Sequence, residues 1–255
     1  MFNLDLEVKK FQISSGPLKT VALYFKCGQR AAISVFTHGY TSQKTDQLFW
    51  AQRLAKKGID TILFDLPGHL LGEGSPVENF EDFTKYCPQL FSEALNLASI
   101  QAHEKVILGG HSLGALLSLK ALELDELSPF KKLTIAVGMG LELSDSPHPL
   151  EKDFFKETLA FRKNLVSPAL APAHFFPWMK AMKKNLYATN ERIHLIAGED
   201  DIIVPKNGVE NLAKILEEKN NIVTFEKPRR LPHFEPMLAA PYLEKIISTF
   251  LVSNS

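Results

Sequence analysis

Cysteine is scarce in this 255-residue chain, which has only Cys27 and Cys87, far apart and outside any CxxC pattern. Two such cysteines provide neither a disulfide framework nor a thiolate metal site, and we interpret both as small apolar side chains. An excess of charge is also missing, because 29 Lys and Arg balance 29 Asp and Glu. No basic run exceeds a doublet such as Arg229-Arg230, which argues against a nucleic-acid or anionic-membrane partner.

Long apolar runs are missing as well. No run approaches the ~20 residues that span a bilayer. The first ten residues mix acidic with apolar side chains and lack the cationic start and apolar core of a signal peptide. We therefore expect a cytoplasmic protein without a membrane partner, and the composition leaves its oligomeric state open.

The composition, with 45% hydrophobic and 23% charged residues, is typical of one globular domain. Among the aromatic residues, 18 are Phe. Short apolar runs alternate with segments of helical period. The expected strands are 4–13, 18–26, 31–37, 60–65, 105–109, 132–139, 192–197 and 221–227. The expected helices are 46–57, 78–102, 112–125 and 207–218, followed by a C-terminal helix that includes 243–251. This order predicts an N-terminal hairpin followed by βαβ units, that is, an α/β protein whose mostly parallel eight-stranded sheet is flanked by helices.

The alternation breaks between about residues 141 and 191, after the sixth strand. Prolines interrupt two or three short helical stretches there, at Pro147, Pro149, Pro168, Pro172 and Pro177. No linker separates this segment from the rest. We therefore predict a single domain over 1–255 with a helical cap inserted at about 141–191.

The sharpest motif is a buried strand that runs into a helix with Gly110, Ser112 and Gly114 at the junction. On a very tight strand-to-helix turn, a Cβ two residues before or after the serine would clash, and glycine removes that clash. The turn lifts the hydroxyl clear of the sheet and leaves free N–H groups of the helix start beside it. The spacing therefore indicates a nucleophilic serine.

A serine nucleophile needs a base, and the base needs an orienting acid. Asp200 and Asp201 follow the strand 192–197, and His233 follows the strand 221–227. Because parallel-sheet enzymes build their sites at the carboxyl ends of strands, these side chains are the candidates for acid and base.

With these residues the chain resembles the α/β-hydrolase superfamily, in its serine-nucleophile, esterase/lipase-like branch with a small cap. The residues that carry the resemblance are 38–40 (His-Gly-Tyr), 65–69 (Asp-Leu-Pro-Gly-His), 110–114 (Gly-His-Ser-Leu-Gly), 198–205 and His233. The chain order nucleophile, acid, histidine is that of the family. The branches of this fold that hydrolyse haloalkanes and epoxides use Asp where this chain has Ser112, so the serine disfavours them.

The resemblance implies the role of each residue. Ser112 would be the nucleophile, His233 the base and then the acid, and Asp201 the orienting acid, with Asp200 as the alternative. The backbone N–H groups of Tyr40 and Leu113 would form the oxyanion hole. Pro232 and the long loop 67–75 depart from the family pattern, so the substrate of any one subfamily is not transferred.

The expected function is hydrolysis of a carboxylic ester or a related acyl bond through an acyl-serine, as in carboxylesterases. The substrate would be a small molecule, and the mechanism needs neither a metal nor an organic cofactor. Large apolar side chains of the cap indicate an apolar substrate pocket, or alternatively simple packing of the cap onto the sheet. They are Phe154, Phe155, Phe161, Phe175, Phe176, Trp178 and Met179. A thioesterase, a C–C bond hydrolase or an acyltransferase would use the same triad, and a non-catalytic ligand-binding protein is the remaining alternative.

Overall fold

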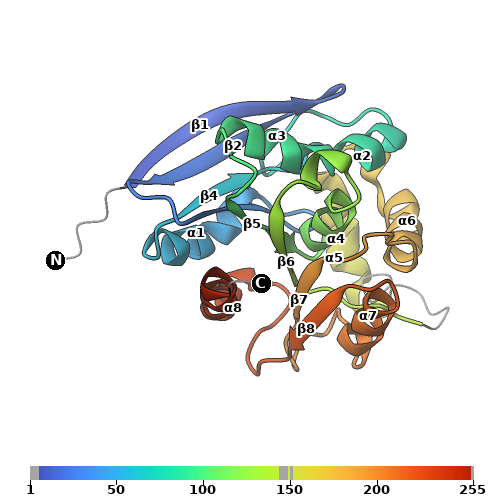
Figure 1. The fold of residues 1–255 in the computed structure, drawn as a ribbon. Helices are drawn as coiled ribbons and strands as arrows, with labels where there is room; N and C mark the ends of the chain where they lie inside the picture. The colour runs from blue at the N-terminus through green and yellow to red at the C-terminus, as the bar shows by residue number, and fades with distance from the viewer. Residues whose placement is uncertain (1–5, 144–148, 150–151, 254–255) are drawn as a thin grey trace.

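A sheet of eight strands is the centre of the computed structural model, which describes residues 6–143, 149 and 152–253 (Figure 1). The strands are β1 (Leu6–Ser15), β2 (Leu18–Cys27), β3 (Ala32–Thr37), β4 (Ile59–Phe64), β5 (Lys105–His111), β6 (Lys131–Val137), β7 (Arg192–Ile196) and β8 (Ile222–Glu226). Their order across the sheet is β1-β2-β4-β3-β5-β6-β7-β8. The pairs β1/β2 and β2/β4 are antiparallel, and all pairs from β4 to β8 are parallel. The predicted fold class is confirmed.

Helices cover both faces of the sheet (Figure 1). They are α1 (Leu48–Ala55), α2 (Phe80–Tyr86), α3 (Gln89–Leu97), α4 (Leu113–Ala121), α7 (Gly208–Glu217) and α8 (Ala240–Val252), with short 3₁₀ turns η1 (Lys44–Gln47), η2 (Asp125–Leu127) and η7 (Pro236–Ala239). One buried cluster joins α1 and α8 to one face, and a larger cluster joins α3, α4 and α7 to the other. The result is a three-layer α/β/α arrangement.

Side chains of the central strands alternate between these two clusters. In β3, Val35 packs in the cluster of α3 and α4, whereas Phe36 packs in the cluster of α1 and α8. In β5, Leu108 and Ile107 divide in the same way. Because both faces are covered, these strands are buried along most of their length, which explains their continuous apolar runs in the sequence.

Several predicted elements differ from the structure in extent, and two of these differences have a clear physical reason. The single helix expected over 78–102 is wrong, because the structure has α2 and α3 separated at Cys87 and Pro88. Pro88 has no N–H to donate to the preceding turn, so the first helix ends before it. The strand expected over 132–139 ends at Val137, because Gly138 takes a positive φ of 65° and turns the chain.

The cap segment 141–191 lies between β6 and β7, as expected, and is helical where it is described. Its elements are η4 (Asp153–Phe155), α5 (Lys156–Arg162), η5 (Lys163–Leu165), η6 (Pro168–Leu170) and α6 (Pro172–Lys184). α6 packs against α4, the helix that follows Ser112. Across the described parts of the chain, no helix is both long and apolar enough to cross a lipid bilayer.

Trp50 of α1 anchors the smaller cluster and provides a test of the packing. Its side chain is fully buried, its ring meets Phe36 edge-on at 5.3 Å between centroids, and its indole N–H donates to the carbonyl of Pro236 over 2.8 Å. We expect Trp50→Ala to lower the free energy of unfolding by about 3–5 kcal/mol, as measured by urea denaturation.

The neighbouring Phe49 is a matched control because it is 54% exposed on the same helix. Phe49→Ala should change the free energy of unfolding by less than about 0.5 kcal/mol. An equal loss for the two variants would contradict the assignment of Trp50 as a packing anchor.

Candidate active site

Ser112 occupies a strained turn between β5 and α4. Its backbone has φ of 51° and ψ of −105°, a conformation that L-residues rarely adopt. A Cβ on Gly110 would lie 2.4 Å from the carbonyl oxygen of Thr37, and a Cβ on Gly114 would lie 2.2 Å from the same atom. Both positions must therefore be glycine for this turn to form, because the end of β3 approaches both of them. A Cβ on Gly110 would also clash with the backbone of Gly114.

The structure brings together the three residues that the sequence proposed as a triad. The Nδ1 of His233 lies 2.8 Å from Oδ2 of Asp201, and its Nε2 lies 3.3 Å from the Ser112 hydroxyl oxygen. The Asp201 and His233 side chains are 2% and 5% exposed. Because an ionised carboxylate only accepts, Nδ1 carries the proton and Nε2 is free to accept the serine proton.

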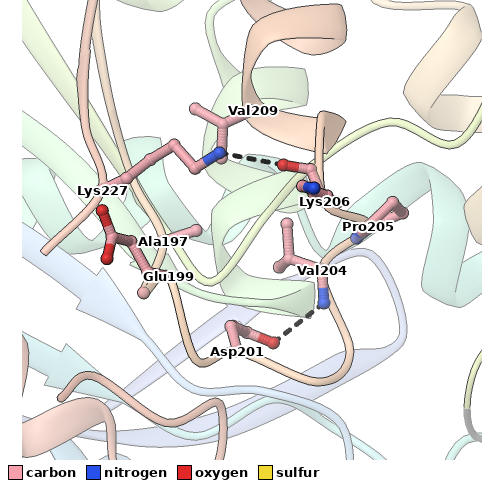
Figure 2. A pocket seen from close by; sticks show the side chains of 9 residues that line it. Ala197, Glu199, Asp201, Val204, Pro205, Lys206, Val209 and Lys227 are labelled. Atoms are coloured by element: carbon pink, nitrogen blue, oxygen red, sulfur yellow. Dashed lines mark hydrogen bonds between the residues drawn. The ribbon is translucent and has the colours of Figure 1, made fainter. Parts of the chain in front are cut away.

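The loop after β7 holds Asp201 in place. Its second oxygen, Oδ1, accepts hydrogen bonds of 2.8 Å from the backbone N–H groups of Ile203 and Val204. Figure 2 shows the bond to Val204 in a pocket that Asp201 and Val204 both line. Burial acts to raise the pKa of Asp201. The bond to His233 and these N–H donors outweigh burial, so the pKa lies below its usual range and the side chain is an anion at neutral pH.

Asp200, the alternative acid, has a different place. It is exposed, and its carboxylate accepts from the backbone N–H of Leu231 over 2.9 Å. This bond ties the acid loop to the loop that carries His233. A Cβ on Gly198 would lie 2.1 Å from the carbonyl oxygen of Leu231, so the two loops are in close contact. Asp200 therefore joins the loops, and Asp201 contacts the histidine.

The backbone N–H groups of Tyr40 and Leu113 have no acceptor among the described residues. Buried N–H groups are nearly always paired, so two unpaired ones beside a nucleophile have the character of an anion site. These are the two groups that the resemblance implied as an oxyanion hole.

His38 fixes the peptide that carries one of these N–H groups. Its Nε2 accepts from the N–H of Leu66 over 2.8 Å, so Nδ1 carries the proton and donates to the carbonyl of Gly39 over 2.8 Å. In a trans peptide the C=O and the following N–H point in opposite directions. Holding the Gly39 carbonyl therefore fixes the direction of the Tyr40 N–H.

The long loop 67–75 encloses a buried carboxylate. Asp65 is fully buried and accepts from the backbone N–H groups of Lys44 and Glu73 over 2.7 and 2.8 Å, and also from the Lys44 ammonium. A Cβ on Gly72 would lie 2.4 Å from the Asp65 carboxyl carbon. The loop 67–75, which is longer than the family pattern, thus folds around Asp65. It also contributes Leu71 to the lining of the cavity at Ser112.

A cavity of about 200 Å³ opens at Ser112. It is lined by residues of the main domain and by one cap residue, namely Gly39, Tyr40, Thr41, Ser42, Gln43, Asp46, Leu71, His111, Ser112, Arg162, His233, Phe234 and Pro236. The lining is mixed in polarity, with both a cation and an anion. Where their side chains are described, the cap aromatic residues expected to form an apolar pocket do not line this cavity.

These aromatic residues pack elsewhere wherever their side chains are described. Phe175 stacks on the Tyr40 ring at 4.3 Å between centroids, and Trp178 meets Phe80 edge-on at 5.7 Å. Phe176 and Met179 are buried in the larger cluster, Phe155 packs against it, and Phe161 is 67% exposed. The Phe154 side chain lies outside the described residues. The alternative interpretation, packing of the cap onto the sheet, therefore accounts for Phe175, Phe176 and Trp178.

Sequence reasoning missed Arg162 and Phe234 as neighbours of the site. Arg162 ends α5, and its guanidinium lies 4.9 Å from the centroid of the Phe234 ring. Phe234 directly follows His233, so its position was available from the sequence. Arg162 belongs to no motif, and only the packing of the cap places it at the cavity.

No group of three or more His, Cys, Asp or Glu side chains among the described residues is arranged to hold a metal ion. The expectation that the chemistry needs no cofactor stays a prediction.

Comparison with known proteins agrees with this geometry. Residues 35–245 match the sequence profile described as the Alpha/beta hydrolase family. The chain belongs to this family. No curated protein sequence matches the chain.

Solved structures of several other proteins share its fold. An esterase from Pyrococcus furiosus, Pf2001, has a TM-score of 0.71 and 18% identity over 98% of this chain and 92% of the esterase. A bromoperoxidase from Bacillus anthracis has a TM-score of 0.69 and 17% identity over 96% and 100% of the two chains. The epoxide hydrolase VrEH1 from Vigna radiata reaches 0.68 at 10% identity over 96% and 98%. At these identities the likeness establishes the fold alone.

Buried histidines beside the site make stability depend on pH. His69 is 1% exposed, its Nε2 has no hydrogen-bond partner, and its ring lies 5.2 Å from that of His38. Burial, with a contribution from His38, lowers the pKa of His69 to about 3. Below the unfolded pKa of ~6.5 the unfolded chain takes up the proton first, so acid destabilises the fold.

We expect His69→Gln to reduce the slope of unfolding free energy against pH by up to about 1.4 kcal/mol per pH unit between about pH 6 and 4. Urea denaturation at several pH values measures this slope. An unchanged slope would show that His69 is not held neutral by burial.

Proposed function

We propose that this protein is a serine hydrolase that cleaves a carboxylic ester, or a related acyl bond, of a small molecule. The observation that carries the proposal is the connected chain from Asp201 through His233 to the Ser112 hydroxyl, with spacings of 2.8 and 3.3 Å. The strained backbone of Ser112 and the two unpaired N–H groups beside it support the same function.

In the proposed mechanism His233 takes the proton from Ser112 as the hydroxyl oxygen attacks the substrate carbonyl. The N–H groups of Tyr40 and Leu113 stabilise the resulting oxyanion. His233 then protonates the leaving group, which departs and leaves an acyl-serine. Water, deprotonated by His233, attacks the acyl-serine and releases the carboxylic acid and the free Ser112 hydroxyl.

Asp201 has an electrostatic role in this mechanism. As an anion it keeps the His233 proton on Nδ1, and it stabilises the positive imidazolium that forms in each transition state. His111, whose ring lies 4.8 Å from that of His233, does not compete for the proton, because burial and the nearby His233 lower the pKa of His111 to about 3.

The cavity favours a small substrate, because about 200 Å³ accommodates only a short acyl or alcohol group. An apolar substrate is not part of this proposal, since the cap aromatic residues that would have indicated one pack elsewhere.

The decisive variant is Ser112→Ala, which removes the nucleophile. We expect kcat for 4-nitrophenyl acetate to fall by about three orders of magnitude or more. A fluorophosphonate probe should label the wild type and leave Ser112→Ala unlabelled. Ser128→Ala changes an exposed serine outside the site and is the control. Wild-type hydrolysis by Ser112→Ala would contradict the proposal, and absence of labelling in the wild type would favour a non-catalytic protein.

A panel of matched acetyl compounds distinguishes the reactions that share this mechanism. We expect the phenyl ester to be hydrolysed with a higher kcat/KM than the corresponding thioester and 1,3-diketone, as measured with purified protein in water. Preference for the thioester or for the diketone would reassign the protein to thioesterase or C–C bond hydrolase activity. Adding a primary alcohol tests for acyl transfer, which would produce a new ester in place of the acid.

A further inference from the structure

Among the described lining residues of the cavity, Arg162 is the one that comes from the cap, and it carries a full charge. It lines the cavity together with Ser112 and His233. We propose that Arg162 makes the enzyme selective for substrates that carry a carboxylate in addition to the scissile acyl bond. This inference rests on the proposed function, because it names the substrate class of the same site.

The Arg162 guanidinium lacks an anionic partner among the described residues. It donates one hydrogen bond, from Nη1 to the Thr41 hydroxyl. No acidic side chain among the described residues forms an ion pair with it within 4.0 Å. Its Nε is buried without an acceptor. Arginine has five N–H donors in a planar fork that fits a carboxylate, and most of them are unused here.

The charge of Arg162 is partly removed from water. Burial lowers the pKa of Arg162, and the nearby Tyr40 only partly offsets that effect, yet a guanidinium stays protonated at neutral pH. The Phe234 ring, 4.9 Å from the guanidinium carbon, covers one side of it. Partial burial of a cation without a counter-ion is costly, and a substrate anion would relieve that cost.

The acidic side chains near Ser112 do not pair with Arg162. Asp46 also lines it, but the Asp46 carboxylate accepts from the Ser42 hydroxyl and makes no ion pair with Arg162. Asp201 is already bonded to His233. The cavity therefore holds a cation that makes no ion pair with a described residue, together with the Asp46 carboxylate, which accepts from Ser42 instead.

A carboxylate is favoured over a phosphate by the size and donor set of the site. The cavity is about 200 Å³, and Arg162 is the sole Lys or Arg in its described lining. One guanidinium edge satisfies the two oxygens of a carboxylate, whereas phosphate sites in proteins use several donors around three oxygens.

Arg162 also has a structural contact that the experiment must separate from substrate recognition. The Thr41 hydroxyl that accepts from Arg162 itself donates to the Tyr40 carbonyl over 2.6 Å. Loss of Arg162 can thereby disturb the loop that carries the Tyr40 N–H, and this would slow the cleavage of every ester. Selectivity between two matched substrates, rather than rate alone, is therefore the readout.

Two pairs of esters test the proposal, each a carboxylate against its neutral amide of the same shape. Mono-4-nitrophenyl adipate and its terminal amide place the group on the acyl side, and 4-acetoxybenzoate and 4-acetoxybenzamide place it on the leaving-group side. We expect wild type to prefer the carboxylate in at least one pair, by about tenfold or more in kcat/KM. Arg162→Met should abolish that preference, mainly through KM, and Arg162→Lys should restore part of it.

Lys163→Met is the matched control, because it removes the same charge from the exposed neighbouring residue. It should keep the wild-type preference. Equal preference for acid and amide in the wild type in both pairs would overturn the proposal. Equal losses on acid and amide in Arg162→Met, with the preference retained, would also overturn it and leave Arg162 as a structural contact of the cap.

Binding of adipate, measured by titration calorimetry, separates failure of this inference from failure of the proposed function. Adipate should bind wild type and the Ser112→Ala variant, and should bind Arg162→Met at least about tenfold more weakly. Adipate binding that depends on Arg162, without hydrolysis of any ester, would support the anion site and reject the hydrolase. Ester hydrolysis without adipate binding and without carboxylate preference would support the hydrolase and reject the anion site.

Discussion

The close approach of the end of β3 to the turn at Ser112 is the contact on which the site depends. Thr37 presents its carbonyl oxygen where a side chain on Gly110 or Gly114 would stand, at 2.4 and 2.2 Å. The next residue, His38, accepts from the Gly114 N–H over 3.0 Å through its own carbonyl. One segment therefore holds the serine turn and continues directly into the Tyr40 N–H, so the nucleophile and the proposed oxyanion donors share a single rigid frame.

Around this frame, hydrogen bonds from polar side chains join one loop to another. Asp200 joins the acid loop to the histidine loop, and His38 joins the Gly39 peptide to the chain after β4. Asp65 and Lys44 hold the long loop that reaches the cavity. Each of these hydrogen bonds fixes a backbone segment that carries a site residue. Burying His38, Lys44 and Asp65 also costs desolvation free energy, so these contacts position the site more than they stabilise the fold.

Sequence reasoning recovered the sheet, the order of its elements and the three residues that meet at the site, because each leaves a local pattern. The glycines around Ser112, the acid after one strand and the histidine after the next strand each form a pattern that spans only a few residues. The split at Pro88 was also open to local reasoning, since a proline inside a helical pattern ends the first helix. The role of the cap could not be predicted in this way, because its aromatic residues are equally compatible with a substrate pocket and with packing onto the sheet. In the structure, Phe175 and Trp178 pack against other aromatic rings.

By itself, the sequence determined the α/β class, the strained serine turn and the identity of the nucleophile, acid and base candidates, since backbone sterics and strand order act over short distances. Only the tertiary structure decided that Asp201 rather than Asp200 contacts His233, that the Tyr40 and Leu113 N–H groups are unpaired, and that Arg162 reaches the cavity. These facts depend on how distant segments pack: Arg162 and Thr41 are 121 positions apart in the chain and meet only when the cap folds over the sheet edge. Such contacts follow from the packing of the whole chain, which no short pattern encodes.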